Sequence, residues 1–183
     1  SGSKPYSPPP AQAGPFGTPS RLDHLRPDRL HLCNRSPPRM ALGPMKRKIL
    51  PDTLVGERLS LRPISPADIT AVLVYSSDPD VTTYLPWHPT VDAMVVRMFL
   101  QQQQDRRRKG TSFGYAVTEL ASGEMIGAID LMGLQSGHPG NCELGYVFRR
   151  ASWGLGYATE AGALLLDAAF QNPGILVVDA YAD

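Results

Sequence analysis

The amino-acid sequence predicts an α/β (α+β) domain with a mixed central sheet, in the element order β-α-α-β-β-β-α-β. Two segments in which apolar and polar residues alternate, 112–120 and 125–134, are joined by the turn Ala-Ser-Gly-Glu, a pattern typical of an antiparallel hairpin. Further along, a turn with two glycines joins a strand-like to a helix-like segment, and an apolar strand follows at 175–182. An apolar content of 42% and a mean hydropathy of -0.19 are ordinary for a globular protein.

Residues 1–48 differ in composition from the rest of the chain. They are rich in Pro, Gly and Ser and carry nine Lys or Arg residues against two Asp residues, a net charge of +7, so the remaining residues carry -6. We predict a disordered tail over 1–48, followed by a domain over 49–183. The basic tail would allow contact with nucleic acid or ribosomal RNA, although its scattered charges favour a solvated extension. Because Met45 lies directly before the domain, residues 1–44 fit an extension of the gene rather than part of the natural protein.

Composition also bears on membranes, export and metals. No apolar run approaches the ~18 residues that a membrane span requires. The first residues lack the pattern of a secretory signal, so we expect a cytoplasmic protein without membrane contact. Cys33 and Cys142 cannot form a disulfide framework or a zinc site, and no other ligand spacing is present, so no metal is expected.

The first half of the domain contains one strand and two helices. Alternation over 57–64 predicts a half-buried strand. Ser65 as N-cap and Pro66 at the first helical position predict a helix that runs to about Ser76. A second helix is predicted over 91–108, with a cation-rich C-terminus. Its apolar face is expected to consist of Val91, Met94, Val95, Met98 and Phe99.

The second half begins with the two hairpin segments and a third strand at 142–148, after which the glycine turn leads into a helix over 157–170. The sequence Asn-Pro-Gly ends this helix before the last strand. The stripe that packs on the sheet is expected to contain Ala158, Ala161, Leu165 and Ala168.

The glycine turn lies in the segment SWGLGYATEA, residues 152–161. Gly154 and Gly156 allow the backbone to approach a ligand closely, and N–H groups at a helix start favour a phosphate. A Walker loop is excluded because no Gly-Lys-Ser/Thr follows. A dinucleotide fingerprint is the rival, since Asp179 lies about 20 residues further on. It fails at Thr159, where a third glycine belongs, and because an antiparallel meander comes first.

Longer motifs around the turn resemble those of a known enzyme family. The motifs are ELGYVF followed by W-G-x-G-Y-A-T-E-A, the earlier G-E-R-L-x-L-R-P, and YLPW. Over 54–183 the chain resembles the GNAT superfamily of acyl-CoA N-acetyltransferases, and within it the RimJ and RimL branch that acetylates ribosomal proteins at alanine. The resemblance implies a GNAT fold, acetyl-CoA as cosubstrate, no metal, and acetyl transfer to a primary amine. The family signature begins with Gln or Arg, where this chain has Trp153.

The resemblance also implies which residues bind the cosubstrate. The pyrophosphate is expected on the turn residues Gly154, Leu155, Gly156, Tyr157, Ala158 and Thr159. The pantetheine arm is expected beside the preceding strand at Val147 and Phe148, with a backbone N–H near Val147 stabilising the oxyanion. For both strand residues, a plain core role is compatible with this contact.

Acetyl transfer to an amine needs a base, because an ammonium group with a pKa of roughly 8 to 10 must lose a proton near pH 7. Glu143, at the start of the strand before the turn, stands where several GNAT enzymes keep a catalytic glutamate. Its alternative role is a solvent-facing strand residue, and Asp130 is the second choice of base. Cys142 allows an acyl-cysteine route, but a small buried thiol is the favoured role.

The aromatic segment between the two predicted helices helps to wall the acceptor pocket in this family. Trp87 is therefore the candidate for contact with the acceptor, with a core role as the alternative, and His88 is expected to be a surface loop residue. Thr159 and Glu160 in the first helical turn are explained by the helix dipole alone.

The expected function is an N-acetyltransferase that acts on a protein N-terminal α-amine by direct attack in a ternary complex. The alternatives are an acetyltransferase for a small amine, such as an antibiotic or a polyamine, and a non-catalytic CoA-binding fragment. In the family, the strand at 175–182 leads into a further helix and a C-terminal hairpin. Because the chain ends at Asp183, we predict a C-terminally truncated domain with an uncovered sheet edge and poor activity.

Overall fold

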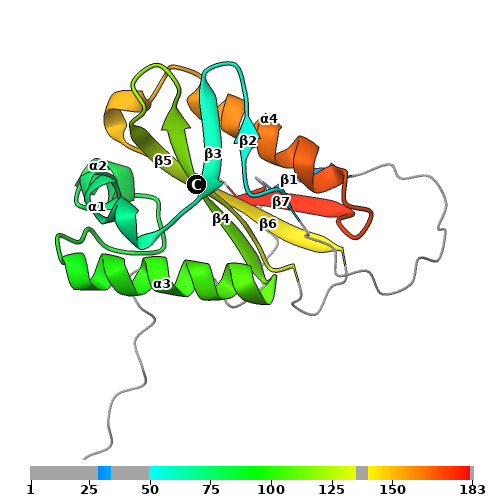
Figure 1. The fold of residues 1–183 in the computed structure, drawn as a ribbon, viewed down its shortest axis with the longest axis horizontal. Coiled ribbons are helices and arrows are strands. Elements are labelled where there is room, and N and C mark those ends of the chain that lie inside the picture. Colours follow the sequence, from blue (N-terminus) through cyan, green and yellow to red (C-terminus); the bar gives the residue numbers. More distant parts are fainter. Residues whose placement is uncertain (1–28, 34–49, 135–139, 182–183) are drawn as a thin grey trace, which may run out of the picture.

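The computed structural model describes residues 29–33, 50–134 and 140–181, which form one mixed seven-stranded sheet with helices on both faces (Figure 1). The strand order is β1-β7-β6-β5-β4-β3-β2. All neighbouring strands are antiparallel except β6 and β7, which are parallel. The strands are β1 (Arg29–Cys33), β2 (Leu54–Val55), β3 (Leu59–Pro63), β4 (Ser112–Glu119), β5 (Met125–Met132), β6 (Asn141–Phe148) and β7 (Val177–Tyr181).

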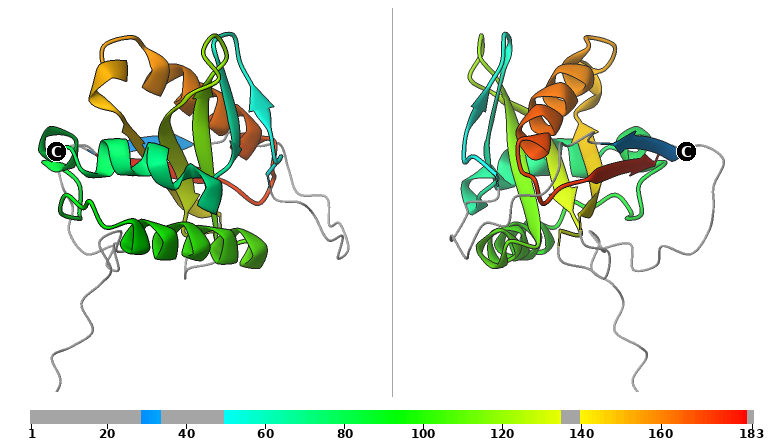
Figure 2. Two further views of the ribbon diagram at one scale, coloured as in Figure 1. Left: turned by 60° about the vertical axis from the view of Figure 1, so that its left-hand side comes forward. Right: turned by 90° about the vertical axis from the view of Figure 1, so that its right-hand side faces the viewer.

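The helices divide between the two faces of this sheet. The long helix α4 packs on one face, and α1 and α3 pack on the other, where α2 continues from α1 (Figures 1 and 2). The helices are η1 (Pro66–Asp68), α1 (Ile69–Ser76), α2 (Pro79–Thr82), α3 (Ala93–Lys109), η2 (Arg150–Ser152) and α4 (Tyr157–Phe170), η denoting a 3-10 turn. The predicted β-α-α-β-β-β-α-β order and the mixed sheet are confirmed. The short elements β1, β2, α2 and η2 were not predicted, and the first residues of the helix predicted to end at about Ser76 form the 3-10 turn η1.

The predicted ends of α3 are close to those observed, whereas the predicted apolar face is right only in part, since Phe99 packs towards the core but three of its other members are exposed. The side chain of Asp92 caps the first turn through the N–H of Met94 at 2.7 Å, and Gly110 ends the helix in the left-handed region with φ 69°. Met94 and Met98 are exposed, whereas Val96 and Leu100 are buried. Both faces of the first half of this helix carry apolar residues, so periodicity alone does not decide which one packs.

The predicted stripe of α4 is correct. Ala161, Leu165 and Ala168 are buried in a cluster that α4 shares with β3 to β7, and Ala158 packs against its edge. A second cluster lies on the opposite face between the sheet and helices α1 and α3, and contains Val72, Val96 and Leu100. Glycine is required at position 127 of β5, since a Cβ there would lie 2.5 Å from the backbone oxygen of Val147 on β6.

The outer edge of β7 was expected to be uncovered, but another strand pairs with it. Strand β1 pairs with it antiparallel, with Arg29 opposite Tyr181 and Cys33 opposite Val177. This strand lies inside the segment 1–48 predicted to be disordered; the rest of that segment, apart from these five residues, lies outside the described residues. Among the described helices, none is long and apolar enough to cross a membrane.

Strands β6 and β7 part halfway along, which positions the candidate site. Their pairing runs from Asn141 opposite Val177 to Leu144 opposite Ala180. The remaining residues of β6, 145–148, stay paired to β5 but have no partner on β7 (Figure 2). The glycine turn follows this half of β6 and leads into α4, so the helix begins next to the opening between the two strands.

Candidate functional site

The start of α4 presents backbone N–H groups, and no side chain of the described residues caps them. Gly154 and Gly156 adopt left-handed conformations, with φ 73° and φ 76°, which glycine takes without a steric penalty. Gly156 occupies the N-cap position and offers no side chain to the following N–H groups. The first N–H groups of a helix have no intrahelical partner and lie at the positive end of its dipole, so this turn is suited to an anion.

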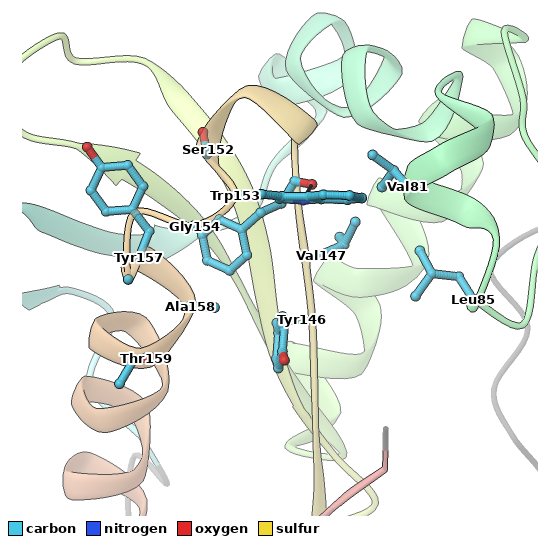
Figure 3. A pocket seen from close by; sticks show the side chains of 12 residues that line it. Val81, Leu85, Tyr146, Val147, Ser152, Trp153, Gly154, Tyr157, Ala158 and Thr159 are labelled. Carbon is cyan, nitrogen blue, oxygen red and sulfur yellow. Dashed lines mark hydrogen bonds between the residues drawn. The ribbon is translucent and has the colours of Figure 1, made fainter. Parts of the chain in front are cut away.

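A cavity of about 450 Å³ opens at this turn (Figure 3). Its wall includes all but one of the residues predicted to bind the cosubstrate: Val147, Phe148, Gly154, Gly156, Tyr157, Ala158 and Thr159. The exception is Leu155, which is 52% exposed and does not line the cavity. Residues from the strand, the turn and the helix are therefore gathered on one surface.

Five lining residues were not predicted: Val81, Leu85, Tyr146, Ser152 and Trp153. Val81 and Leu85 lie in and just after α2 and face the strand across the cavity (Figure 3). Arg150 holds this segment against the turn, because its guanidinium group pairs with Asp78 and Asp80 at the start of α2. The motif YLPW contains Leu85, so it was the feature of the sequence from which a contribution of this segment to the cavity could have been predicted.

The direction of the backbone groups on β6 limits which N–H groups near Val147 are candidates for stabilising the oxyanion. The N–H of Arg149 donates to the carbonyl of Ile126 at 3.0 Å, so the backbone groups of this residue point towards β5. Since neighbouring residues of a strand point alternately to either side, the N–H of Val147 also points towards β5. The N–H groups of Tyr146 and Phe148 point to the edge beyond the pairing with β7, and within the described residues they are the β6 donors next to the cavity that neither neighbouring strand pairs.

Trp153 ties the turn to the same edge. Its indole N–H donates to the carbonyl of Phe148 at 2.9 Å, and the ring lies along the cavity with 49% of the residue exposed. In Figure 3 the indole extends from the turn towards Val81. The Phe148 carbonyl is thus occupied within the chain, and the indole forms part of the cavity surface.

Glu143 lies on β6, half-buried and three residues before Tyr146, and it is not among the cavity residues. Its neighbours Cys142 and Leu144 pack into the cluster beneath α4, so its side chain belongs to the opposite face of the sheet. Three strand residues correspond to about 10 Å, which separates this carboxylate from the cavity wall along the strand.

Asp130 lies on the same face, one strand away. It is paired in register with Gly145, so its Cβ and that of Glu143 occupy diagonal positions about 7 to 8 Å apart. Burial raises the pKa of Asp130. Hydrogen bonds from the hydroxyl of Ser112 at 2.7 Å and from the amide of Gln103 at 3.2 Å oppose this shift in part. The structure therefore brings the two predicted candidate bases together at one place on the sheet.

Cys142 has the properties of a structural thiol. It is 5% exposed, packs in the cluster beneath α4, and its Sγ lies 3.6 Å from the carbonyl of Val177. Burial raises the pKa of this thiol to about 12. A thiol with that pKa holds almost no thiolate near pH 7, so the geometry opposes an acyl-cysteine route.

The two aromatic-segment residues lie away from the cavity surface. Trp87 is half-buried and packs against the cluster between the sheet and helices α1 and α3, which matches the alternative core role. His88 is exposed, as expected for a loop residue. Over the described part of the chain, no group of three His, Cys, Asp or Glu side chains is arranged to hold a metal ion.

The mixed sheet, the parting strands and a helix start suited to an anion are the features with which known proteins are compared, and the comparison identifies the class of protein as acetyltransferases. A family model described as "Acetyltransferase (GNAT) domain" matches residues 58–183. The N-acetyltransferase p20 of Bacillus licheniformis, itself described as uncharacterized, is 30% identical over 129 residues, which is 70% of this chain and 72% of p20.

Solved structures share the fold. A GNAT-family acetyltransferase from Bacillus anthracis aligns with a TM-score of 0.59 at 25% identity, over 70% of this chain and 72% of that one. An acetyl transferase from Salmonella typhimurium, described as modifying the N-terminal serine of ribosomal protein L7/L12, aligns with a TM-score of 0.57 at 17% identity, over 66% and 68% of the two chains. This chain belongs to the GNAT family of acetyltransferases and is an acyltransferase enzyme. The dinucleotide-binding alternative is thereby excluded.

GNAT acetyltransferases use acetyl-CoA. The structure fits that cosubstrate in two places. A Cβ on Gly154 would meet no described atom within 4 Å, so there is free space beside the turn, and Gly156 at the N-cap offers no side chain to the first N–H groups of α4. The uncovered edge of β6 at Tyr146 and Phe148 lies next to it on the cavity wall.

Proposed function

We propose that this acetyltransferase transfers the acetyl group of acetyl-CoA to a protein N-terminal α-amine, by direct attack in a ternary complex. The observation that carries the proposal is the cavity at the uncapped start of α4, bordered by the uncovered half of β6. The diphosphate would bind the N–H groups of residues 155–159, where helix dipole and glycine backbone favour negative charge. The pantetheine arm would follow the edge of β6 at Tyr146 and Phe148.

The bound cosubstrate supplies an activated acetyl group as a thioester. An N–H from Tyr146 or Phe148 stabilises the negative charge that develops on the carbonyl oxygen. Glu143 accepts the proton that the acceptor ammonium must lose before its nitrogen forms the new bond to the acetyl carbon. The carbon–sulfur bond of the thioester then breaks, and the CoA thiolate leaves and takes up the second proton that this nitrogen releases, carried by water. Because about 10 Å of strand separates Glu143 from Tyr146, the proton passes directly only if the amine enters along β6, and otherwise through water. Asp130, diagonal to Glu143, is the second candidate base.

The choice of a protein N-terminus as acceptor rests on two supports. One is the motif set around the turn, which resembles that of the RimJ and RimL branch. The other is the shared fold with the Salmonella typhimurium structure, whose described acceptor is the N-terminal serine of a ribosomal protein. A small amine remains the competing acceptor, and a fragment that binds CoA without transferring acetyl groups is the competing function. The basic tail as a contact to ribosomal RNA stays a separate prediction.

Substitution of Glu143 tests the proposal in the 183-residue chain. Acetyl transfer is measured with peptides that begin with Ala or Ser, with spermidine and with an aminoglycoside, and CoA binding is measured by calorimetry. Loss of a general base lowers kcat by about 10²- to 10⁴-fold, so Glu143→Gln should lose that activity while its Kd for CoA stays unchanged. Glu57→Gln is the matched control, because Glu57 is exposed and lies outside the cavity.

Three results would contradict parts of the proposal. Full turnover of Glu143→Gln removes this residue from the mechanism and directs attention to Asp130. Faster transfer to spermidine or the aminoglycoside than to any peptide replaces the proposed acceptor. CoA binding without transfer to any acceptor identifies a binding fragment.

A further inference from the structure

Arg58 contacts both the glycine turn and the first turn of α4. It stands just before β3, in the motif G-E-R-L, and the hairpin of β2 and β3 lies beside α4 (Figure 1). Its Nη1 donates to the carbonyl oxygen of Leu155 at 2.9 Å, and its Nε donates to Glu160 at 2.8 Å. Its backbone N–H donates to the other oxygen of Glu160 at 2.8 Å, and the guanidinium carbon lies 4.7 Å from the ring centroid of Tyr157.

These contacts fix the orientation of one peptide group in the turn. In a planar trans peptide, the carbonyl and the following N–H point in opposite directions. Because the Leu155 carbonyl points at Arg58, the N–H of Gly156 points away from Arg58. Gly156 lines the cavity and Arg58 does not, so the bond from Arg58 aims a phosphate-binding N–H into the site.

The packing around Arg58 leaves little freedom for this arrangement. A Cβ on Gly56 would lie 2.7 Å from Leu164 and 2.9 Å from a carboxylate oxygen of Glu160, so the chain before Arg58 lies directly against α4. The hydroxyl of Tyr157 donates to Glu119, which holds the ring beneath the guanidinium group. The conformation of the turn is therefore fixed by contacts with residues of α4, of β4 and of the segment before β3, and not only by contacts within the turn.

Arg58 also neutralises a charge that would oppose a phosphate. Glu160 lies in the first turn of α4, where an ionised carboxylate and a diphosphate repel each other. Burial by itself raises the pKa of Glu160, but hydrogen bonds from the backbone and side chain of Arg58 outweigh it and lower the pKa. Glu160 is thus ionised and paired, and the helix dipole alone does not account for it, contrary to the expectation from the sequence.

We infer that Arg58 is a positioning residue for the CoA diphosphate: it orients the Gly156 N–H through the Leu155 carbonyl and cancels the charge of Glu160. The inference rests on the proposed use of this turn by CoA. It gives the G-E-R-L motif a role, since Gly56 permits the approach to α4 and Arg58 makes the contacts. Arg58 acts through the turn, so its loss should weaken the binding of acetyl donors that carry the diphosphate. The binding of acetyl donors that lack the diphosphate should be unchanged.

The test compares two acetyl donors in three single variants and one double variant. Acetyl-CoA carries the diphosphate, and S-acetyl-pantetheine presents the same thioester without it. Arg58→Met should raise the Kd of CoA by at least about tenfold and the KM of acetyl-CoA similarly, with kcat/KM for S-acetyl-pantetheine unchanged. The Kd of CoA for Arg58→Lys should lie between those of the unsubstituted chain and Arg58→Met. A lysine keeps the positive charge near Glu160 but lacks the planar guanidinium group that reaches Leu155. Arg62→Lys is the control, since Arg62 lies in β3 and pairs with Asp68, away from the turn.

The outcomes separate this inference from the proposed function. If the unsubstituted chain binds no CoA by calorimetry, both fall. If it binds CoA and the folded Arg58→Met variant binds equally well, the inference alone is overturned. An equal loss for both donors also overturns it, because that pattern indicates general destabilisation. Partial recovery of CoA affinity in Arg58→Met combined with Glu160→Gln would support charge cancellation, and no recovery would remove that part of the role.

Discussion

Two glycines with the same backbone conformation but different surroundings allow a sharp test of the site. Gly154 in the turn has φ 73° and Gly123 in the β4–β5 hairpin has φ 70°, and a Cβ on either would meet nothing within 4 Å. Substitution by alanine therefore adds no clash at either position. Its cost is the left-handed backbone conformation, about 1 to 2 kcal/mol. For a chain of this size that corresponds to a fall in Tm of about 2 to 4 °C per kcal/mol.

The two substitutions should differ only in ligand binding. Gly154 lines the cavity, where an added methyl group occupies the space next to the phosphate-type N–H groups, whereas Gly123 is not among the cavity residues. We expect Gly154→Ala and Gly123→Ala to lower the Tm of the free protein equally. Only Gly154→Ala should weaken the binding of CoA, with a Kd raised by at least about tenfold. At a CoA concentration of 100 Kd, binding stabilises the folded state by about 2.7 kcal/mol, so the CoA-induced rise in Tm reports the difference.

Thermal unfolding with and without CoA, together with calorimetry, measures both effects. The reasoning is refuted if Gly154→Ala binds CoA with the affinity of the unsubstituted chain, or if Gly123→Ala loses the same affinity. Unequal losses of Tm in the free proteins would show that the cost is not set by the backbone conformation.

Two further predictions concern buried titratable groups. Burial holds the pKa of Asp130 above its usual value, so its ionisation opposes folding as the pH rises from about 4. Asp130→Asn should therefore gain stability relative to the unsubstituted chain between pH 4 and pH 7 in urea unfolding, and a pH-independent difference would contradict this. Cys142, with a pKa of about 12, should react with iodoacetamide only after unfolding, and Cys142→Ala should keep its acetyl-transfer activity. Rapid labelling of the native chain at this residue, detected by peptide mass spectrometry, would contradict the assignment of a structural thiol.

Predictions from the sequence succeeded where local patterns are unambiguous. The stripe of α4 and the hairpin of β4 and β5 follow from the spacing of apolar residues and from turn residues, which act over a few positions. The face of α3 was predicted only in part, with Phe99 correct and Met94 and Met98 wrong, because the two methionines satisfy the helical period as well as Val96 and Leu100 do. Only contact with the sheet decides between them.

In the candidate site, too, local patterns predicted some features, whereas others depend on contacts between distant segments. The glycine turn and its helix start were visible because left-handed conformations and exposed N–H groups depend on residues next to one another. The contribution of Val81 and Leu85 depends on how α2 is held by Arg150, and the direction of each N–H on β6 depends on pairing with β5. Neither relation is expressed in a local spacing.

The sequence by itself determined the order of the elements, the antiparallel sheet before the β-α-β unit, and the turn that marks the chain as a GNAT acetyltransferase. Tertiary structure decided which groups face the cavity, where β6 and β7 part, and how Arg58 clamps a turn whose Glu160 lies 102 residues away in the chain. The physical reason is that backbone conformation follows mainly from neighbouring residues, whereas the aim of a hydrogen bond and the pairing of a charge depend on groups that only folding brings together.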